Sequence, residues 1–191
     1  MTRGEKVCAF IEHYCLIPEG AHVGRPIKLM KFQRKFILDV FDNLHGTSRA
    51  YLSVARKNGK SALIAAILLA HLVGPEAKQN SQIISGARSR DQAALVFKLA
   101  EKMVRLSPEL SKIVRIVPSQ KRLIGLICNV EYKAISAESG TAQGLPNSGQ
   151  ESVESSKPRA CQLQVASRHK RFCLASRSLA SKGELFSLVV P

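Results

Sequence analysis

Residues 54–70, with the sequence VARKNGKSALIAAILLA, constrain the fold of this chain more than any other segment. A short strand-like run, RAYLSV at residues 49–54, leads into a loop that contains one glycine. The loop is followed by a strongly apolar helical run over residues 60–73, which ends at Gly74-Pro75. A strand, a glycine-containing turn and a helix in this order are the context that a phosphate-binding P-loop requires.

The tripeptide Gly59-Lys60-Ser61 matches the G-K-[ST] end of the P-loop motif. Gly59 lets the backbone turn, so that its N–H groups and the helix N-terminus form a nest for phosphate. Lys60 would reach the β- and γ-phosphate oxygens, and the Ser61 hydroxyl would coordinate Mg²⁺. The first glycine of the motif is absent, because Val54 occupies that position. The alternative is an ordinary helix N-cap in a basic loop.

The remaining segments up to residue 145 alternate between helical and strand-like patterns. Apolar residues at helical spacing predict amphipathic helices, and short apolar runs predict strands. The predicted helices span residues 4–17, 30–44, 60–73 and 89–106, and the predicted strands span residues 49–54, 81–86, 113–117, 123–128 and 132–136. Pro108 is expected to break the last helix. This alternation indicates βαβ units, so we predict an α/β fold with a P-loop NTPase-type parallel sheet flanked by helices.

The charge of the chain favours polyanionic partners. Lys and Arg number 29 against 14 Asp and Glu, which gives a formal net charge of +15. Such a surface attracts nucleic acid, nucleotides or acidic lipid, and a solvated basic face is the alternative. Aromatic residues make up only 5% of the chain and Trp is absent, which argues against base-stacking platforms as the main function. No CxxC pair occurs among the five cysteines, so a zinc ribbon is not expected.

No segment predicts a membrane location. The N-terminal residues include Glu5 and Glu12 and hold no long apolar run, so a signal peptide is not expected. The longest apolar stretch, from Ala62 to Val73, contains His71 and is too short to span a bilayer. We therefore expect no membrane partner.

The character of the chain changes near residue 145. Residues 146–191 hold nine serines, seven basic residues and three acidic residues, and they show no sustained period of 2 or 3.6. We therefore divide the chain into a globular unit at residues 1–145 and a tail at residues 146–191. The tail is expected to be irregular, either disordered or poorly packed.

Four segments carry a resemblance to a known family. In chain order they read IKLMKFQRKFILDVF, SVARKNGKS, IISGARSRDQAALVFKLAEKMV and KAISAESGTAQGLP. Together they resemble the ATPase domain of phage terminase large subunits, over roughly residues 5–145. The resemblance implies a part of a DNA-packaging motor that uses ATP and Mg²⁺. It also implies double-stranded DNA, a small terminase subunit and a portal as partners, and the cytoplasm of the phage host as the location.

The resemblance also assigns roles to individual residues. Phe32-Gln33 resembles the adenine-recognising Q motif, and a Gln amide can both donate to and accept from the adenine edge. The alternative is that Gln33 belongs to the polar face of an amphipathic helix. Arg56 is the catalytic candidate, because an arginine there can stabilise γ-phosphate charge, and a solvated loop residue is the alternative. The implied cofactor-binding residues are Gln33, Arg56, Lys57, Asn58, Gly59, Lys60 and Ser61, with Ser61 as the Mg²⁺ ligand.

The family that the sequence resembles has Walker B carboxylates after the segment that corresponds to KAISAESGTAQGLP. These carboxylates are missing from this sequence. No Asp follows Asp91, and none of the three glutamates of the tail follows a short apolar strand. A tail translated out of the ancestral frame would explain the loss, and a divergent C-terminus is the alternative. We therefore expect a truncated ATPase domain with an incomplete sheet, weak nucleotide binding and little turnover. The alternative function is that of a basic, non-enzymatic DNA-binding or phage assembly protein.

Overall fold

The computed structural model describes residues 1–47, 50–55, 57–87, 90–136, 173–179 and 183–189, and every structural statement below concerns these residues. The helices are α1 (Arg3–Tyr14), α2 (Lys31–Phe41), α3 (Lys60–Leu72), α4 (Arg90–Leu106), α5 (Pro108–Ile113) and the 3₁₀ helix η1 (Pro118–Gln120). The strands are β1 (Ala50–Val54), β2 (Gln82–Ala87), β3 (Val114–Val117), β4 (Arg122–Gly125), β5 (Val130–Ser136), β6 (Cys173–Leu179) and β7 (Gly183–Val189).

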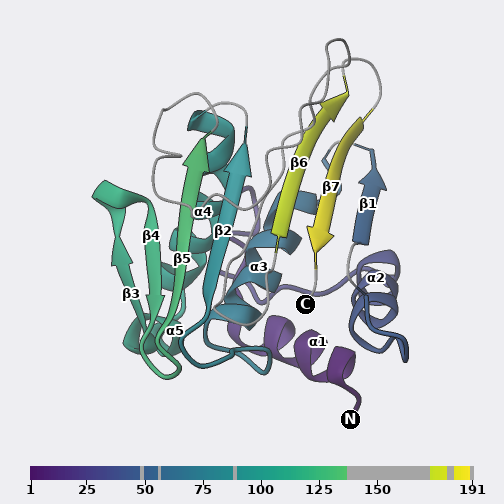
Figure 1. Cartoon of the computed structure of the whole chain (residues 1–191), viewed down its shortest axis with the longest axis horizontal. Helices are drawn as coiled ribbons and strands as arrows, with labels where there is room; N and C mark the ends of the chain where they lie inside the picture. The colour runs from purple at the N-terminus through teal and green to yellow at the C-terminus, as the bar shows by residue number, and fades with distance from the viewer. Residues whose placement is uncertain (48–49, 56, 88–89, 137–172, 180–182, 190–191) are drawn as a thin grey trace, which may run out of the picture.

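The described strands form one sheet in the order β1-β7-β6-β2-β5-β4-β3 (Figure 1). Strand β2 is parallel to β5 and β6, and every other neighbouring pair is antiparallel. The predicted α/β class with flanking helices is confirmed, but the prediction of a parallel sheet is wrong, because the sheet is mixed. The links at residues 118–121 and 126–129 hold four residues each, whereas a parallel connection needs a crossover of a dozen or more.

Two strands lie in the segment that was expected to be irregular. Strand β6 is paired with β2, and β7 runs along the whole of β1, from the pair Ala50–Leu188 to the pair Val54–Glu184. The structure thus has two strands, at residues 173–179 and 183–189, within the tail that was expected to be irregular, and the poor packing of this tail stays a prediction. Pairing between backbones far apart in the sequence needs no strong local side-chain period, which is why the pattern did not predict it. The other residues of the segment lie outside the described part of the chain.

Local capping signals set the starts of two helices. Helix α1 begins with a capping box, in which Thr2 Oγ1 accepts from the Glu5 N–H and the Glu5 carboxylate accepts from the Thr2 N–H. Helix α5 was not predicted, because Pro108 was expected only to break α4. Ser107 is the N-cap of α5, and Pro108 follows it as the first residue of the helix. This combination favours a helix start.

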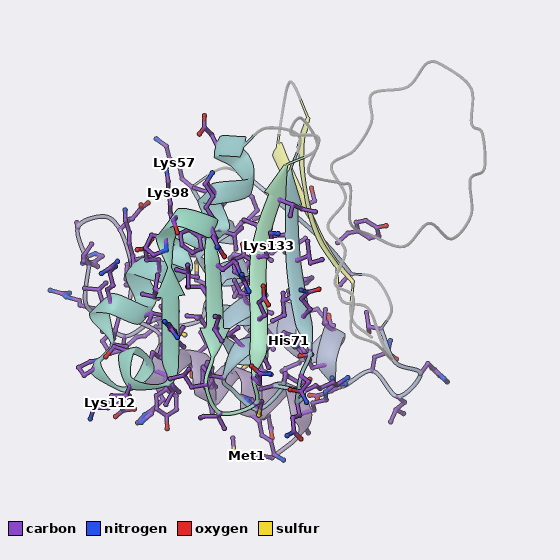
Figure 2. All side chains as sticks on the ribbon, turned by 60° about the vertical axis from the view of Figure 1, so that its left-hand side comes forward. Met1, Lys57, His71, Lys98, Lys112 and Lys133 are labelled. Carbon is purple, nitrogen blue, oxygen red and sulfur yellow. The ribbon has the colours of Figure 1, made fainter. Side chains whose placement is uncertain are left out.

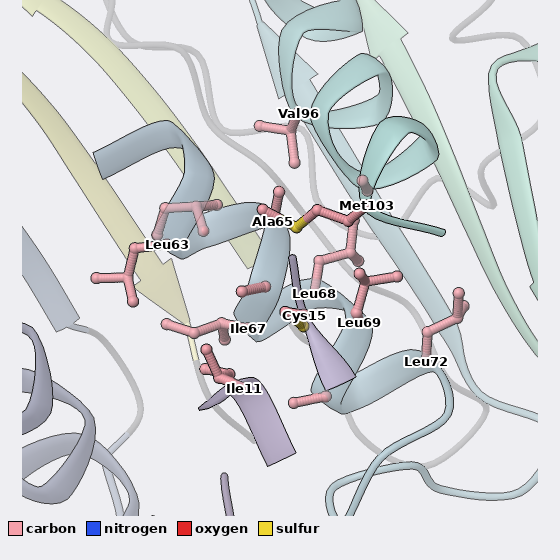
Figure 3. Close-up of a cluster of buried hydrophobic side chains, with 14 of the residues drawn as sticks. Ile11, Cys15, Leu63, Ala65, Ile67, Leu68, Leu69, Leu72, Val96 and Met103 are labelled. Atoms are coloured by element: carbon pink, nitrogen blue, oxygen red, sulfur yellow. The ribbon is translucent and has the colours of Figure 1, made fainter. Parts of the chain in front are cut away.

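Helix α3 is the centre of the hydrophobic core. Every residue from Leu63 to Leu72 is buried, as is typical of a helix that is apolar on all sides. Figure 3 shows side chains of α1 and α4 around it, including Ile11, Val96 and Met103. No helix of the described ranges, α3 included, is both long and apolar enough to cross a membrane. In the view of Figure 1, α3 lies behind the sheet. It begins at the loop that follows β1.

Candidate phosphate-binding site

The loop at residues 55–59 lies at the edge of the sheet where four strands end. Because β7 is antiparallel to both β1 and β6, strand β1 has the same direction as β6, β2 and β5. The carboxyl ends of these four strands therefore lie at one edge, the upper edge in Figure 1. The loop starts at this edge after Val54 and enters α3 at Lys60. Open α/β sheets bind their ligands at this edge.

The backbone of the loop turns sharply before α3 begins. Gly59 is the N-cap of α3 and has a left-handed conformation, with a φ of 68°, which glycine adopts at little cost. Lys57 has a φ of 67°, which is uncommon for a residue with a side chain. Within α3 the Leu63 N–H donates to the Gly59 carbonyl over 2.9 Å. The N–H groups of the preceding first turn have no carbonyl partner within the helix, so this end of α3 suits an anion.

The Lys60 side chain folds back onto the end of β1. Its Nζ donates to the carbonyl oxygens of Val54 and Ala55, each over 2.8 Å, and the residue is only 3% exposed. A buried ammonium group is costly unless its protons are hydrogen-bonded, and these two carbonyls satisfy part of that need. Lys60 therefore lies inside the loop rather than extending into solvent.

Gln33 and Asn58 complete the contacts around the loop. The Asn58 side chain donates from Nδ2 to the Ala55 carbonyl over 3.1 Å. Gln33, near the start of α2, is 6% exposed, and its Nε2 donates to the Asn58 carbonyl over 3.4 Å. A Cβ added at Gly59 would lie 3.5 Å from that same Nε2. The structure thus brings together Gln33, Asn58, Gly59 and Lys60 from the predicted set.

The remaining predicted residues have different positions. Ser61 is the second residue of α3 and is partly buried. Lys57 is exposed, and Figure 2 shows it at the upper edge of the molecule. Arg56, the catalytic candidate, lies outside the described residues. The carbonyls of Val54 and Ala55 were missed by the sequence analysis, and no signal could have identified them, because every residue type carries a backbone carbonyl.

The register of the sheet places one acidic residue of β7 at the same end of β1. The backbone of Glu184 is paired with Val54, the last residue before the loop. Sequence reasoning dismissed Glu184, because it does not follow an apolar strand. Only the pairing of β7 with β1, across a separation of more than a hundred residues, gives it this position.

The described residues hold no group of three or more His, Cys, Asp or Glu side chains that could bind a metal ion. A P-loop site does not require such a group, because one Ser or Thr hydroxyl and the phosphate oxygens supply much of the Mg²⁺ coordination. The Ser61 hydroxyl, next to the buried Lys60, fits that donor set.

The sheet and the strand–loop–helix unit at its carboxyl edge define the class of protein, an α/β domain of the ATPase type. The chain belongs to the family described as "Terminase large subunit, ATPase domain", whose model matches residues 31–147, more than half of the chain. The resemblance predicted from the four sequence segments is therefore confirmed.

Two matched proteins give the extent of the similarity. The terminase large subunit of Enterobacteria phage HK97 is 66% identical over 145 residues, which cover 76% of this chain and 29% of the relative. The crystal structure of the HK97 bacteriophage large terminase matches with a TM-score of 0.69 and 62% identity, again over 76% of this chain and 29% of that one. The chain thus spans less than a third of the length of these relatives.

Proposed function

We propose that this chain binds ATP with Mg²⁺ through the loop at residues 55–61, as the nucleotide-binding part of a phage DNA-packaging motor. The observation that carries the proposal is the position of Lys60, which is buried inside a loop at the carboxyl edge of the sheet and donates to two backbone carbonyls. Membership of the terminase ATPase family supports the choice of nucleotide. The alternative of a basic, non-enzymatic DNA-binding or assembly protein is not favoured by this family.

In the proposed complex, Lys60 Nζ would donate to phosphate oxygens, with which charge-assisted hydrogen bonds are stronger than those to the carbonyls of Val54 and Ala55. The backbone N–H groups at the start of α3 donate to the same phosphates. The Ser61 hydroxyl would hold Mg²⁺, which supplies charge neutralisation between phosphates. Lys57, which is exposed, would add positive charge near the phosphates, and Arg56 remains the proposed residue that stabilises γ-phosphate charge.

The proposed partners follow from charge and from the family. The net charge of +15 favours double-stranded DNA as a polyanionic partner. By the same resemblance, a small terminase subunit and a portal would be the protein partners in assembly. These contacts would belong to the complete motor, of which this chain spans a part.

Thermal unfolding with and without Mg²⁺-ATP tests the binding site. At an ATP concentration ten times the Kd, binding adds about 1.4 kcal/mol to the free energy of unfolding, which raises the Tm by about 3–6 °C for a chain of this size. Lys60→Ala should abolish this rise, because it removes the group that compensates the phosphate charge.

The matched control is Lys112→Ala, which removes one positive charge from an exposed position of α5 at the lower end of the molecule in Figure 2. This variant should keep the full ATP-dependent rise. An equal rise in the Lys60 variant would show that ATP binds elsewhere and would overturn the assignment of the loop.

A further inference from the structure

We propose that Asn58 is a site of spontaneous deamidation, and that the carboxylate formed there opposes phosphate binding by pairing with Lys60. The modification itself does not depend on the proposed function of the loop, whereas its effect on binding rests on that function. Two observations carry the inference. The exposed residue Gly59 directly follows Asn58, and the carbonyl of Ala55 accepts hydrogen bonds from both Asn58 and Lys60.

The reaction needs only the chain and water. The backbone nitrogen of Gly59 attacks the side-chain carbonyl carbon of Asn58, and the new C–N bond closes a succinimide ring. The side-chain nitrogen takes up the proton of the Gly59 N–H and leaves as ammonia. Water then opens the ring at either carbonyl, which gives aspartate or isoaspartate. The sum of these steps replaces one neutral amide by one carboxylate and releases one ammonia.

Gly59 gives the attacking nitrogen the access that this ring closure needs. Glycine has no Cβ that could crowd the nitrogen, and Gly59 is exposed while Asn58 is only partly buried. Gly59 is also the N-cap of α3, a position whose N–H has no carbonyl partner within the helix. The nitrogen is therefore not tied into the hydrogen-bond pattern of α3.

The other asparagines lack this combination. Among the five asparagines of the sequence, Asn58 alone is followed by glycine. The backbone nitrogen that follows Asn80 donates to the Lys78 carbonyl over 3.2 Å. The residue that follows Asn129 is buried in β5. Asn58 should therefore lose its amide before the other asparagines do.

The carboxylate forms beside the group that is proposed to bind phosphate. In the amide form, Asn58 Nδ2 and Lys60 Nζ donate to the same Ala55 carbonyl, over 3.1 and 2.8 Å. An oxygen in the place of Nδ2 is repelled by that carbonyl and attracted by the neighbouring ammonium group. Because Lys60 is buried, salt screens this attraction only weakly. The ion pair neutralises the charge of Lys60, and the added negative charge repels phosphate.

Peptide mapping by mass spectrometry tests the modification without any ligand. In mildly alkaline buffer, the peptide that contains Asn58 should gain the mass of an amide-to-acid conversion before any other asparagine peptide does. The rate should rise with pH, because the attacking nitrogen must lose its proton. The control is Asn58→Gln, whose longer side chain closes a ring far more slowly and should keep its mass. If Asn58 keeps its amide for as long as Asn43 does, the proposal is overturned.

Asn58→Asp tests the effect on binding, because it is identical to one of the two products. We expect this variant to bind Mg²⁺-ATP and inorganic tripolyphosphate about tenfold more weakly or worse, since one negative charge is added near the phosphates. The matched control is Asn43→Asp, which makes the same change at an exposed position after the last residue of α2 and should leave both affinities unchanged. Equal affinities of Asn58→Asp and the unaltered chain would overturn the effect on binding.

Incubation of the unaltered chain gives a second measurement that needs no acidic variant. Its affinity for Mg²⁺-ATP should fall in step with the loss of the Asn58 amide. The affinity of Asn58→Gln, whatever its starting value, should stay constant over the same time. Loss of the amide without loss of affinity would overturn the effect on binding.

Protection by the nucleotide links the modification to the proposed site. Saturating Mg²⁺-ATP should slow the loss of the Asn58 amide several-fold, because the N–H groups at the start of α3 would then donate to phosphate oxygens. An unchanged rate in a chain whose Tm rises with ATP would overturn this link. If the chain binds no ATP, the proposed function is contradicted, and with it the effect on binding. The mass of the peptide then still decides whether Asn58 is a modification site.

Discussion

His71 is a titratable side chain in the middle of the core. It belongs to α3, it is 7% exposed, and its ring lies 5.6 Å from that of Phe41. Burial lowers the pKa of His71 from 6.5 to about 3, and the positive charges of Arg3 and Lys78 act in the same direction. A hydrogen bond with the backbone of Glu76 favours the charged form but does not outweigh burial. The folded protein therefore keeps His71 neutral at pH values near 7.

This burial predicts a loss of stability in mild acid. Because the pKa of His71 is lower in the folded chain than in the unfolded chain, its contribution is fully present above pH 6.5 and is lost as the pH falls towards 3. Between pH 7 and pH 5, His71 should lower the free energy of unfolding by about 2 kcal/mol. Urea unfolding at the two pH values measures this change.

The matched variant is His71→Gln, which retains a side chain that can form hydrogen bonds but does not titrate. Its loss of stability between pH 7 and pH 5 should be smaller by about 2 kcal/mol, since every other titratable group is common to both proteins. Equal losses in the two proteins would contradict a neutral, buried His71.

At the level of secondary structure, β6 and β7 connect β1 to the rest of the sheet. Strand β1 is paired with β7, β7 with β6, and β6 with β2. Among the described strands, the strand that leads into the phosphate loop therefore joins β2 through β7 and β6. The stability of β1 should depend on these two strands, although the sequence pattern assigned them to a poorly packed tail.

A proline in β6 tests that dependence. Ala175 is paired with Gly86 of β2 on one side and with Ser187 of β7 on the other. Ala175→Pro removes a backbone donor in the interior of the sheet, and we expect it to lower the free energy of unfolding by about 2 kcal/mol or more. Urea unfolding of the purified variant measures the loss.

The control places the same change outside the described strands. Ala21→Pro lies in an exposed turn between α1 and α2, and it should cost less than Ala175→Pro. If the two variants are equally stable, the original expectation of a tail without regular packing at residues 146–191 would be supported instead, and the pairing of β6 with β2 would not contribute to stability.

At the scale of the whole molecule, the proposed site has the residues that would bind phosphate and Mg²⁺ but not the Walker B carboxylates. Lys60 and Ser61 would hold phosphates and Mg²⁺ from one side. No Asp follows Asp91 in the sequence. The Walker B Asp, which would complete the metal shell, is therefore missing, and so is the Glu beside it that would orient the water. Loss of a group that positions the water costs about two to four powers of ten in rate.

We therefore expect binding of ATP with almost no hydrolysis. Phosphate release should stay far below about one per second, a value at the low end of ordinary enzymes, with and without double-stranded DNA. The comparison protein is Lys60→Ala, whose background rate should be the same. Turnover near one per second that is lost in Lys60→Ala would show that a carboxylate completes the site. Glu184, whose backbone is paired with Val54, would then be the first to test, as Glu184→Gln.

Residues up to 136 show what local sequence determines. The predicted helix at residues 60–73 is observed at Lys60–Leu72, and the predicted strands at residues 49–54 and 81–86 are observed at Ala50–Val54 and Gln82–Ala87. These elements were predictable because apolar spacing, Gly59 and Gly74-Pro75 act within a few residues of one another. The sequence by itself also placed Gly59, Lys60 and Ser61 where a strand is followed by a helix. The order of the four resembling segments predicted the family that the family model then matched.

The tertiary structure alone decided how distant backbones meet. Strand direction, the insertion of β7 and β6 between β1 and β2, and the register that places Glu184 at Val54 depend on hydrogen bonds between segments far apart in the chain. The same holds for Lys60, which is bonded to main-chain carbonyls, and for Gln33, which reaches the Asn58 carbonyl. Backbone carbonyls are identical at every position, so no residue pattern can predict which of them a buried side chain will bind.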